Sequence, residues 1–436
     1  MVAWITKTQS VGFARQSAFE TEATTSFKFI RSAVSIASRP REVEQLDYAT
    51  GQHGAQEAPH VDGGAGGEIT LSFALEGCKV GYDASSEAPV TTSDALAYTI
   101  ALIANHLGSD GSGAVSSAAN FSDGTHLYSR GYQANDVSAA PGGKGVTMTT
   151  IANYNEGEFF VSQTNEDGAL PCVGWVSDVN TTPNDLQLRE TPANQPVPSD
   201  DVLGVAVAYL SSAARVPFTL RSYGDNDGFL EAFVGCTHKS LKLSFFAKKV
   251  PMVEMTIRYS KRKEYSTGGK LQAVTAFQRI APVVGDNGGL LVYGTGGSGA
   301  ATCGWHELEL TIDYGDGIPI DCHGKMKGEA SVELGEPEIS LTAKIPVDSG
   351  DTITSGENPF ETLLTNGTAK SITGIVGSNP GSIFSFTLPA MHLNEAVEIE
   401  DMNGLRAYST KWTAGRYSAD TGSTAPADAL VALGWC

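Results

Sequence analysis

Apolar and polar residues alternate with a period of two in several separate parts of the chain. The alternation runs through residues 69–75, 241–245, 253–259, 308–314 and 339–345. Successive side chains of a β-strand point to opposite faces of the sheet, so this spacing places the apolar residues on one face. We therefore predict antiparallel strands with one buried and one solvated face, and an all-β fold class.

Helical periodicity is scarce by comparison. One apolar stripe at helical spacing predicts a helix over residues 93–107, closed by Gly108. A second, shorter helix is predicted from Asn358 to about Gly367, because Pro359 suits the first helical position. The fold should thus be mainly β with one or two short helices.

Two segments of the chain resemble each other at a separation of 270 residues (338 − 68). Glu68 to Ser72 reads EITLS and Glu338 to Thr342 reads EISLT. A predicted strand precedes each segment, and a predicted helix and further strands follow it. Five matching positions can arise by chance, so chance and duplication both stay open, and the shared order of elements favours duplication.

Long stretches rich in glycine and polar residues separate the predicted strands. They are residues 50–67, 109–120, 180–200 and 294–300. Connections in compact domains are usually about 4–6 residues long, so these stretches are expected to lie outside the core. Such loops are commonly disordered or functional, and in an assembly a neighbouring subunit can order them.

The charge balance limits the classes of partner. The 436 residues carry 29 Lys and Arg against 49 Asp and Glu, a formal net charge of −20. Static nucleic-acid binding needs clustered Lys or Arg and is therefore disfavoured. No apolar run is long enough for a signal peptide or a membrane span, so we expect a cytoplasmic chain with no membrane partner. The six cysteines are scattered, which favours reduced, buried thiols over a disulfide framework.

Three patterns resemble ligand sites but are better explained by ordinary structural features such as loops and turns. Residues 294–299 read GTGGSG, yet a predicted strand follows instead of the helix that a dinucleotide site needs. Asp225 to Glu231 and Asp313 to Gly317 lack the ligand spacing of a calcium loop and suit hairpin turns. A tetrahedral metal site at Cys303, His306, Cys322 and His323 is disfavoured because the spacing matches no known finger.

No arrangement of nucleophile, base and orienting residue is readable in the chain. We therefore assign no catalytic, cofactor-binding or metal-binding residue and expect a protein that is not an enzyme. The densest positive patch is Lys261 to Lys263, with Lys248 and Lys249 nearby. It suits either a solvated hairpin end or a cationic rim that docks on an acidic neighbour.

Eight segments carry a resemblance to a known family. They are 11–23 (VGFARQSAFETEA), 38–51, 66–77 (GGEITLSFALEG), 107–108, 233–246, 308–315 (LELTIDYG), 335–345 and 381–412. Taken in order, these segments resemble the tail tube proteins of long-tailed bacteriophages. The resemblance covers most of the chain and rests on pattern, without an invariant catalytic motif. Residues 110–145 and 165–225 fit it poorly and are interpreted as insertions.

The resemblance implies β-barrel or β-sandwich domains whose inner sheets join those of neighbouring subunits in a ring. Rings stack into a hollow tube through which DNA is ejected into the host. We expect an N-terminal arm at 1–25, a first tube domain at 26–265 and a second one with a C-terminal tail at 266–436. The arm and the loops at 50–67 and 313–328 would reach the adjacent ring.

The implied partners are further copies of the chain, in a trimer of duplicated subunits in preference to a hexamer. The tail tip or baseplate, the tape measure and the tail terminator proteins are further partners, and the implied location is the virion tail after assembly in the host cytoplasm. A trimeric ring would carry a charge of −60 (3 × −20). A lumen of that sign would repel DNA phosphates and let the duplex pass without specific binding.

Two other functions stay open at this point. A head-decoration or baseplate protein can be built on similar β domains. A soluble carbohydrate-binding module or carbohydrate-active enzyme would instead need a concave aromatic cluster, with paired carboxylates for catalysis. Trp175, Trp305, Trp412 and Trp435 are dispersed in the sequence and would have to be gathered by folding.

Overall fold

The computed structural model confirms the predicted β class. Twenty strands belong to one connected sheet that curls into a nearly closed, barrel-like form, and six strands form a second sheet. Apart from Gly367, both predicted helices lie outside the described residues. The residues that the structure describes are 10–16, 21–24, 27–38, 66–75, 116–117, 127–130, 136–154, 156–163, 171–181, 184–192, 194–210, 217–223, 230–247, 249–265, 290–293, 301–315, 318–319, 332–333, 337–346, 367, 369–377, 382–402, 404–414 and 431–436.

The first group of strands surrounds one long, bent strand, β15. The N-terminal part of β15 pairs with β14 and β17, and its C-terminal part pairs with β16 and β20. A register shift between His238 and Ser240 marks the bend. The bounds are β1 Ser10–Arg15, β2 Lys28–Arg31, β3 Ala33–Ser38, β4 Gly67–Ala74, β14 Phe218–Tyr223, β15 Leu230–Phe246, β16 Met252–Tyr259 and β17 Lys261–Tyr265.

The second group is arranged around β25 in the same manner. β25 pairs with β24 along most of its length, with β28 at its N-terminal end (Phe384 to Thr387) and with β27 at its C-terminal end. The bounds are β18 Leu290–Tyr293, β19 Ala301–Gly304, β20 Glu307–Asp313, β21 Ile318–Pro319, β22 Val332–Glu333, β23 Glu338–Pro346, β24 Lys370–Val376, β25 Phe384–Leu393, β26 Glu398–Met402, β27 Leu405–Ala414 and β28 Val431–Trp435.

The two groups share one order of pairing. In the first, β2–β1–β14–β15–β17 are neighbours in one layer and β3–β4–β16–β15 in the other. In the second, β19–β18–β24–β25–β28 and β20–β23–β27–β25 repeat that order. The similar segments EITLS and EISLT lie on β4 and β23, which hold equivalent places. We call the two groups the first half and the second half.

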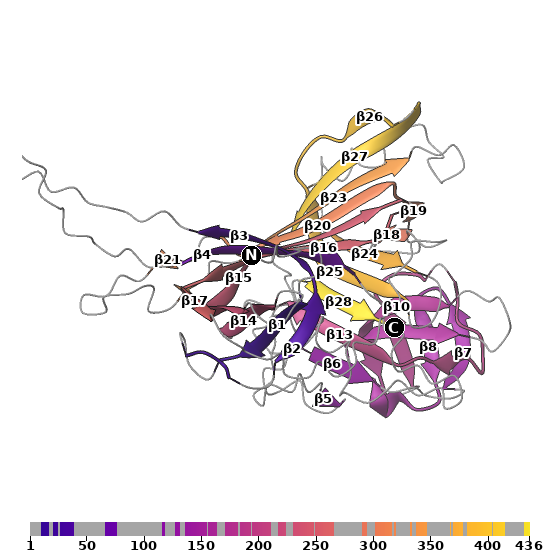
Figure 1. The fold of residues 1–436 in the computed structure, drawn as a ribbon. Coiled ribbons are helices and arrows are strands. Elements are labelled where there is room, and N and C mark those ends of the chain that lie inside the picture. The colour runs from indigo at the N-terminus through magenta and orange to yellow at the C-terminus, as the bar shows by residue number, and fades with distance from the viewer. Residues whose placement is uncertain are drawn as a thin grey trace, which may run out of the picture.

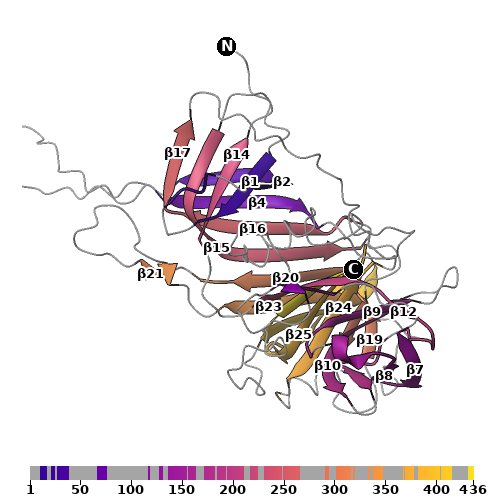
Figure 2. The same ribbon diagram turned by 90° about the horizontal axis from the view of Figure 1, so that it is seen from below.

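The pairing of β15 with β20 joins the halves into one continuous layer. Figure 2 shows β16, β15, β20 and β23 side by side in that layer. β1 lies within the predicted arm at 1–25, yet it pairs with β2 and β14, and Val11 and Phe13 are fully buried. That part of the predicted arm therefore belongs to the first half.

The segment between β4 and β14 contains a separate six-stranded sheet, which we call the insertion. Its strands are paired in the order β12–β9–β10–β11–β8–β7. Residues 146–164, predicted to lie between two insertions, thus belong to the same sheet as their flanks. The bounds are β5 Ser116–Ser117, β6 Leu127–Arg130, β7 Val137–Gly142, β8 Gly145–Met148, a 3₁₀ turn Ile151–Asn153, β9 Phe159–Gln163, β10 Cys172–Asn180, β11 Asp185–Leu188, β12 Asp201–Val202 and β13 Val205–Leu210.

The expectation that residues 180–200 lie outside the core is wrong. They include β11, and Leu186 and Leu188 are buried in the insertion's own core. The polar and proline-rich composition hid a strand of four residues whose alternate side chains point inward. A short strand carries too few alternations to stand out from such surroundings.

The insertion packs against the second half. Figure 1 shows its strands β7, β8 and β10 beside the C-terminal strand β28. The Nε1–H of Trp175 donates a hydrogen bond to Ser385 Oγ at 2.9 Å, and Phe159 packs against Gly434. Ser371 Oγ donates to Glu190 at 2.5 Å, and burial raises the pKa of that carboxyl.

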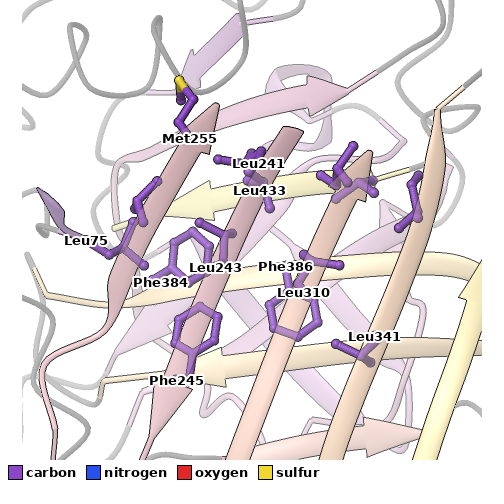
Figure 3. Packing of buried hydrophobic residues seen from close by; sticks show 14 of the residues in the cluster. Leu75, Leu241, Leu243, Phe245, Met255, Leu310, Leu341, Phe384, Phe386 and Leu433 are labelled. Carbon is purple, nitrogen blue, oxygen red and sulfur yellow. The ribbon is translucent and has the colours of Figure 1, made fainter. Parts of the chain in front are cut away.

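The main core lies between the joined layer and the strands that cross it. In Figure 3, Leu243 and Phe245 of β15 and Leu310 of β20 extend toward Phe384 and Phe386 of β25. All five side chains are at most 2% exposed. Burying side chains of this size contributes roughly 1.5–3 kcal/mol each, so the alternation seen in the sequence is a main source of the fold's stability.

Candidate functional site: the polar face and free edges of the long sheet

Eight strands of both halves form one uninterrupted layer, which we call the long sheet. Their order is β3–β4–β16–β15–β20–β23–β27–β26. One face of the long sheet packs on the core. The other face, which we call the polar face, carries the alternate residues, among them Thr70, Ser72, Glu254, Thr256, Ser240, Lys242, Glu309, Thr311, Ser340, Thr342, Lys344, Ser409 and Lys411.

The polar face carries more carboxylates than cations. Among its described residues we count nine carboxylates and five cations, so negative charges exceed positive ones by four. The carboxylates are Glu68, Glu254, Glu307, Glu309, Asp313, Glu338, Glu395, Glu398 and Glu400, and the cations are Lys239, Lys242, Arg258, Lys344 and Lys411. Serine and threonine occupy many of the positions between them.

The cations of this face are engaged by its own carboxylates. Lys242 Nζ lies 2.9 Å from Glu309, and Lys344 Nζ lies 3.2 Å from both Glu307 and Glu400. Hydrogen bonds to these two glutamates raise the pKa of Lys344, which therefore stays charged. Exposed pairs of this kind contribute at most about 1 kcal/mol to stability. Their main effect is to neutralise the cations locally, so the surplus charge of the face is negative.

Both ends of the long sheet are open edges among the described residues. β3 pairs with β4 on one side only, and β26 pairs with β27 on one side only. Ile36 of β3 and Ile399 of β26 occupy core-facing positions, yet they are 36% and 58% exposed. An edge strand presents unpaired backbone N–H and C=O groups that another chain can pair with. The two edges are thus candidate assembly surfaces.

Most residues of the sequence motifs weighed as ligand sites lie outside the part of the chain that the structure describes. Residues 294–299, Asp225, Asp227, Cys322 and His323 lie outside the described residues. Where the chain is described, no group of three or more His, Cys, Asp or Glu side chains is placed to hold a metal ion.

The described members of those motifs have structural contacts. Glu231 forms an ion pair with Arg262, and Asp313 Oδ1 accepts a hydrogen bond from Gly315 N at 2.8 Å. Gly315 has φ +71, a conformation that glycine adopts without strain. The dipeptide Asp316-Gly317, on which the hairpin interpretation rests, lies outside the described residues, so that interpretation stays a prediction.

The basic cluster on β17 also contacts this same chain. Arg262 pairs with Glu231, and Lys263 Nζ lies 2.8 Å from Glu22. Glu22 lies 2.8 Å from Arg221 as well, so it bridges β14 and β17. Two cations of this cluster are therefore already paired within the chain, which weakens the interpretation of the cluster as a rim that docks on an acidic neighbour.

The edge residues Ile36 and Ile399 were missed in the sequence. Ile36 lies in the segment SAVSIASRP, the predicted strand before the first repeat. At the 270-residue offset of the repeat, Ile36 falls on His306, so the repeat alone does not align it with Ile312. Only strand pairing, which places Ile36 opposite Ile69 and Ile312 opposite Ile339, shows that the two residues correspond and that Ile36 lies on an edge.

Comparisons with known proteins do not identify the chain. No protein-family model matches it, and no curated protein matches it in sequence. Among the described residues, no helix is both long enough and apolar enough to cross a bilayer.

Proposed function

We propose that this chain is the structural subunit of a bacteriophage tail tube. The observation that carries the proposal is the long sheet, which has a covered apolar face, a polar face of negative surplus and an open edge at each end. We infer a function for this sheet from its faces and its edges. Assembly through its edges supplies one.

The two edges differ in sequence, which determines the kind of assembly they favour. One edge is β3, near the N-terminus, and the other is β26, near the C-terminus. A contact between unlike surfaces is heterologous, and repeating it generates a ring when the rotation closes. A closed ring leaves no open edge, which is how barrels avoid uncontrolled pairing. Stacked rings of this kind make a tube.

The chemistry of the polar face suits a bore. The apolar face is already covered by strands of this chain, so the polar face is free to line the lumen. Double-stranded DNA carries about one negative charge per 1.7 Å of its axis. A wall with surplus carboxylates repels that charge within the screening length of about 8 Å at physiological salt. The duplex can then slide without a binding site to hold it.

Negative-stain electron microscopy of the purified protein tests the proposal. We expect rings in end-on views and hollow cylinders in side views. The variant Ile36→Lys should remain folded but form neither, because a charged edge opposes strand pairing. The matched control is Val197→Lys, at an apolar residue of the insertion that is 50% exposed against 36% for Ile36, and this variant should assemble normally. Single particles of the wild-type chain under all conditions tested would contradict the proposal.

The alternatives make different predictions. A head-decoration protein would form discrete particles and no cylinders. A carbohydrate-binding module needs exposed aromatic rings, but Trp175, Trp412 and Trp435 are at most 1% exposed and Trp305 packs against the core. Three of these rings are buried and Trp305 is partly buried, so they form no exposed aromatic cluster that would favour the carbohydrate alternative.

A further inference from the structure

We propose that the joint between β15 and β20 inside one chain is the template for the joint between two chains. In this inference, β3 of one copy pairs with the end of β25 and with β26 of the next copy, in the register that β20 adopts on β15. The inference deepens the proposed function and rests on it, since it names the strands and residues that close the ring.

The first step is that β3 and β20 hold equivalent places. Ile36 of β3 lies opposite Ile69 of β4, and Ile312 of β20 lies opposite Ile339 of β23. Ile69 and Ile339 are the same position of the repeated segment, so Ile36 and Ile312 correspond. β20 has β15 as its outer neighbour, whereas β3 has no outer neighbour among the described residues.

The second step is that β15 corresponds to the end of β25 followed by β26. Leu241 and Leu393 occupy equivalent positions two strands away from the repeat. The chains of opposite residues are Leu241–Met255–Leu71 in the first half and Leu393–Trp412–Leu341 in the second. Farther along the strands, Ser244 lies opposite the residue of β16 that is the counterpart of Ser409 in β27. Ser409 is in turn paired with Glu398, so Ser244 corresponds to Glu398. Phe245 therefore corresponds to Ile399.

Each open edge thus lacks the neighbour that the other edge supplies. Within the chain, Leu241 lies opposite Ile312. Replacing each residue by its counterpart places Leu393 of one copy opposite Ile36 of the next. Further copies of this chain can supply the missing neighbour strand at both edges. An unrelated partner would need two different strands, one matching each edge.

The exposure of the edge residues supports this occupant. Ile312 and Phe245, at the joint inside the chain, are 1% and 2% exposed. Their counterparts Ile36 and Ile399 are 36% and 58% exposed, although they face the core side of the same sheet. Each apolar side chain is uncovered at the place where the joint inside the chain covers its counterpart.

Engineered disulfides can test this strand register directly, because they form only between residues that lie close together. On the polar face, Lys242 lies opposite Thr311 at the joint inside the chain, and their counterparts are Asn394 and Ser35. Both counterparts are exposed. Opposed residues of antiparallel strands have Cα atoms about 4.5–5.5 Å apart, within the range of a disulfide. A shift of two residues separates them by about 8 Å, beyond that range.

The test is oxidation of the Ser35→Cys, Asn394→Cys double variant of the full chain under assembly conditions, followed by non-reducing electrophoresis. We expect intermolecular multimers that collapse to monomer on reduction, and the largest member of the ladder counts the copies in the ring. The pair Lys242→Cys, Thr311→Cys should cross-link within one chain without a change of mass. Wild-type protein and each single variant give the background from native cysteines.

The mis-registered pair Ala33→Cys, Asn394→Cys should stay at background. Cross-linking of this pair in place of the first, or of neither pair in protein that forms rings or tubes, would overturn the strand assignment and leave the proposed function standing. Specific cross-linking of the first pair without rings or tubes would support the edge pairing and contradict the tube. Neither cross-links nor rings would overturn both.

Discussion

Phe245 lies where the two halves meet, and its removal measures how much that joint contributes to stability. The side chain is 2% exposed, stacks on Phe384 at 5.7 Å and lies tilted against Phe386 at 6.2 Å between ring centroids. Truncating a buried phenylalanine to alanine typically costs about 3–5 kcal/mol. Loss of two aromatic neighbours places Phe245→Ala in the upper part of that range.

Its counterpart on the open edge should behave differently in the isolated subunit. Ile399 is 58% exposed, so less than half of the roughly 1.5–3 kcal/mol available from a buried isoleucine is realised. We expect Ile399→Ala to cost about 1 kcal/mol or less in the monomer. The same variant should weaken assembly, because the uncovered side chain is the one that a neighbouring copy would cover.

The assay is urea denaturation of the disassembled subunit followed by tryptophan fluorescence, with the free energy of unfolding compared between the two variants. Light scattering of the same proteins under assembly conditions gives the second readout. Equal destabilisation of the monomer by the two variants would refute the conclusion that the joint is covered at Phe245 and uncovered at Ile399. A loss below about 1.5 kcal/mol for Phe245→Ala would refute its place in a closely packed core.

Three further predictions follow from buried positions. Burial raises the pKa of Glu190 above 4.5, so the stability that its protonated form contributes is present below pH 4.5 and is lost as the pH rises. Glu190→Gln should therefore make the urea midpoint of unfolding depend less on pH. A methyl group at Gly374 would overlap the ring of Phe386, and Gly374→Ala should lower the free energy of unfolding by about 1–3 kcal/mol in urea. Burial raises the pKa of Cys172 to about 12 and that of Cys236 further still, so mass spectrometry should find both unalkylated at pH 8 in the native protein and alkylated in urea.

The first two of these predictions have a matched control. Glu395→Gln changes an exposed carboxylate and should leave the midpoint unchanged where Glu190→Gln moves it. Gly404→Ala adds a methyl group where nothing lies within 4 Å, so only its φ of +85 costs energy, about 1 kcal/mol. A steeper pH dependence in Glu190→Gln, a larger loss in Gly404→Ala than in Gly374→Ala, or native alkylation of Cys236 would each contradict the corresponding reasoning.

Much of the long sheet could be predicted from the sequence because its strands obey one simple rule. In β4, β16, β20 and β23 every second residue is apolar, and the structure buries those residues. A period of two survives any change of partner strand, so it is readable without knowledge of the neighbours. The similar segments at 68–72 and 338–342 also indicated which strands hold equivalent places.

The remainder depended on partners that lie far away in the sequence. The four residues of β11 carry too little periodicity to predict a strand, and only the pairing with β8 and β10 defines one. The open edges could not be predicted from the sequence for a different reason. Ile36 and Ile312 occur in similar segments, and their exposures differ because only Ile312 has an outer neighbour strand.

The covalent connection of the two halves in one chain affects how a ring would assemble as well as how the chain folds. In a ring built as proposed, every second joint is the one between β15 and β20, already formed when the chain folds. Only the alternate joints require two molecules to meet, and each such encounter costs translational and rotational freedom of at least about 4 kcal/mol. Covalent linkage replaces half of those encounters by an intramolecular step at high effective concentration. A duplicated chain therefore needs half as many successful collisions per ring as a single-domain subunit, and it cannot place two identical halves side by side in the wrong order.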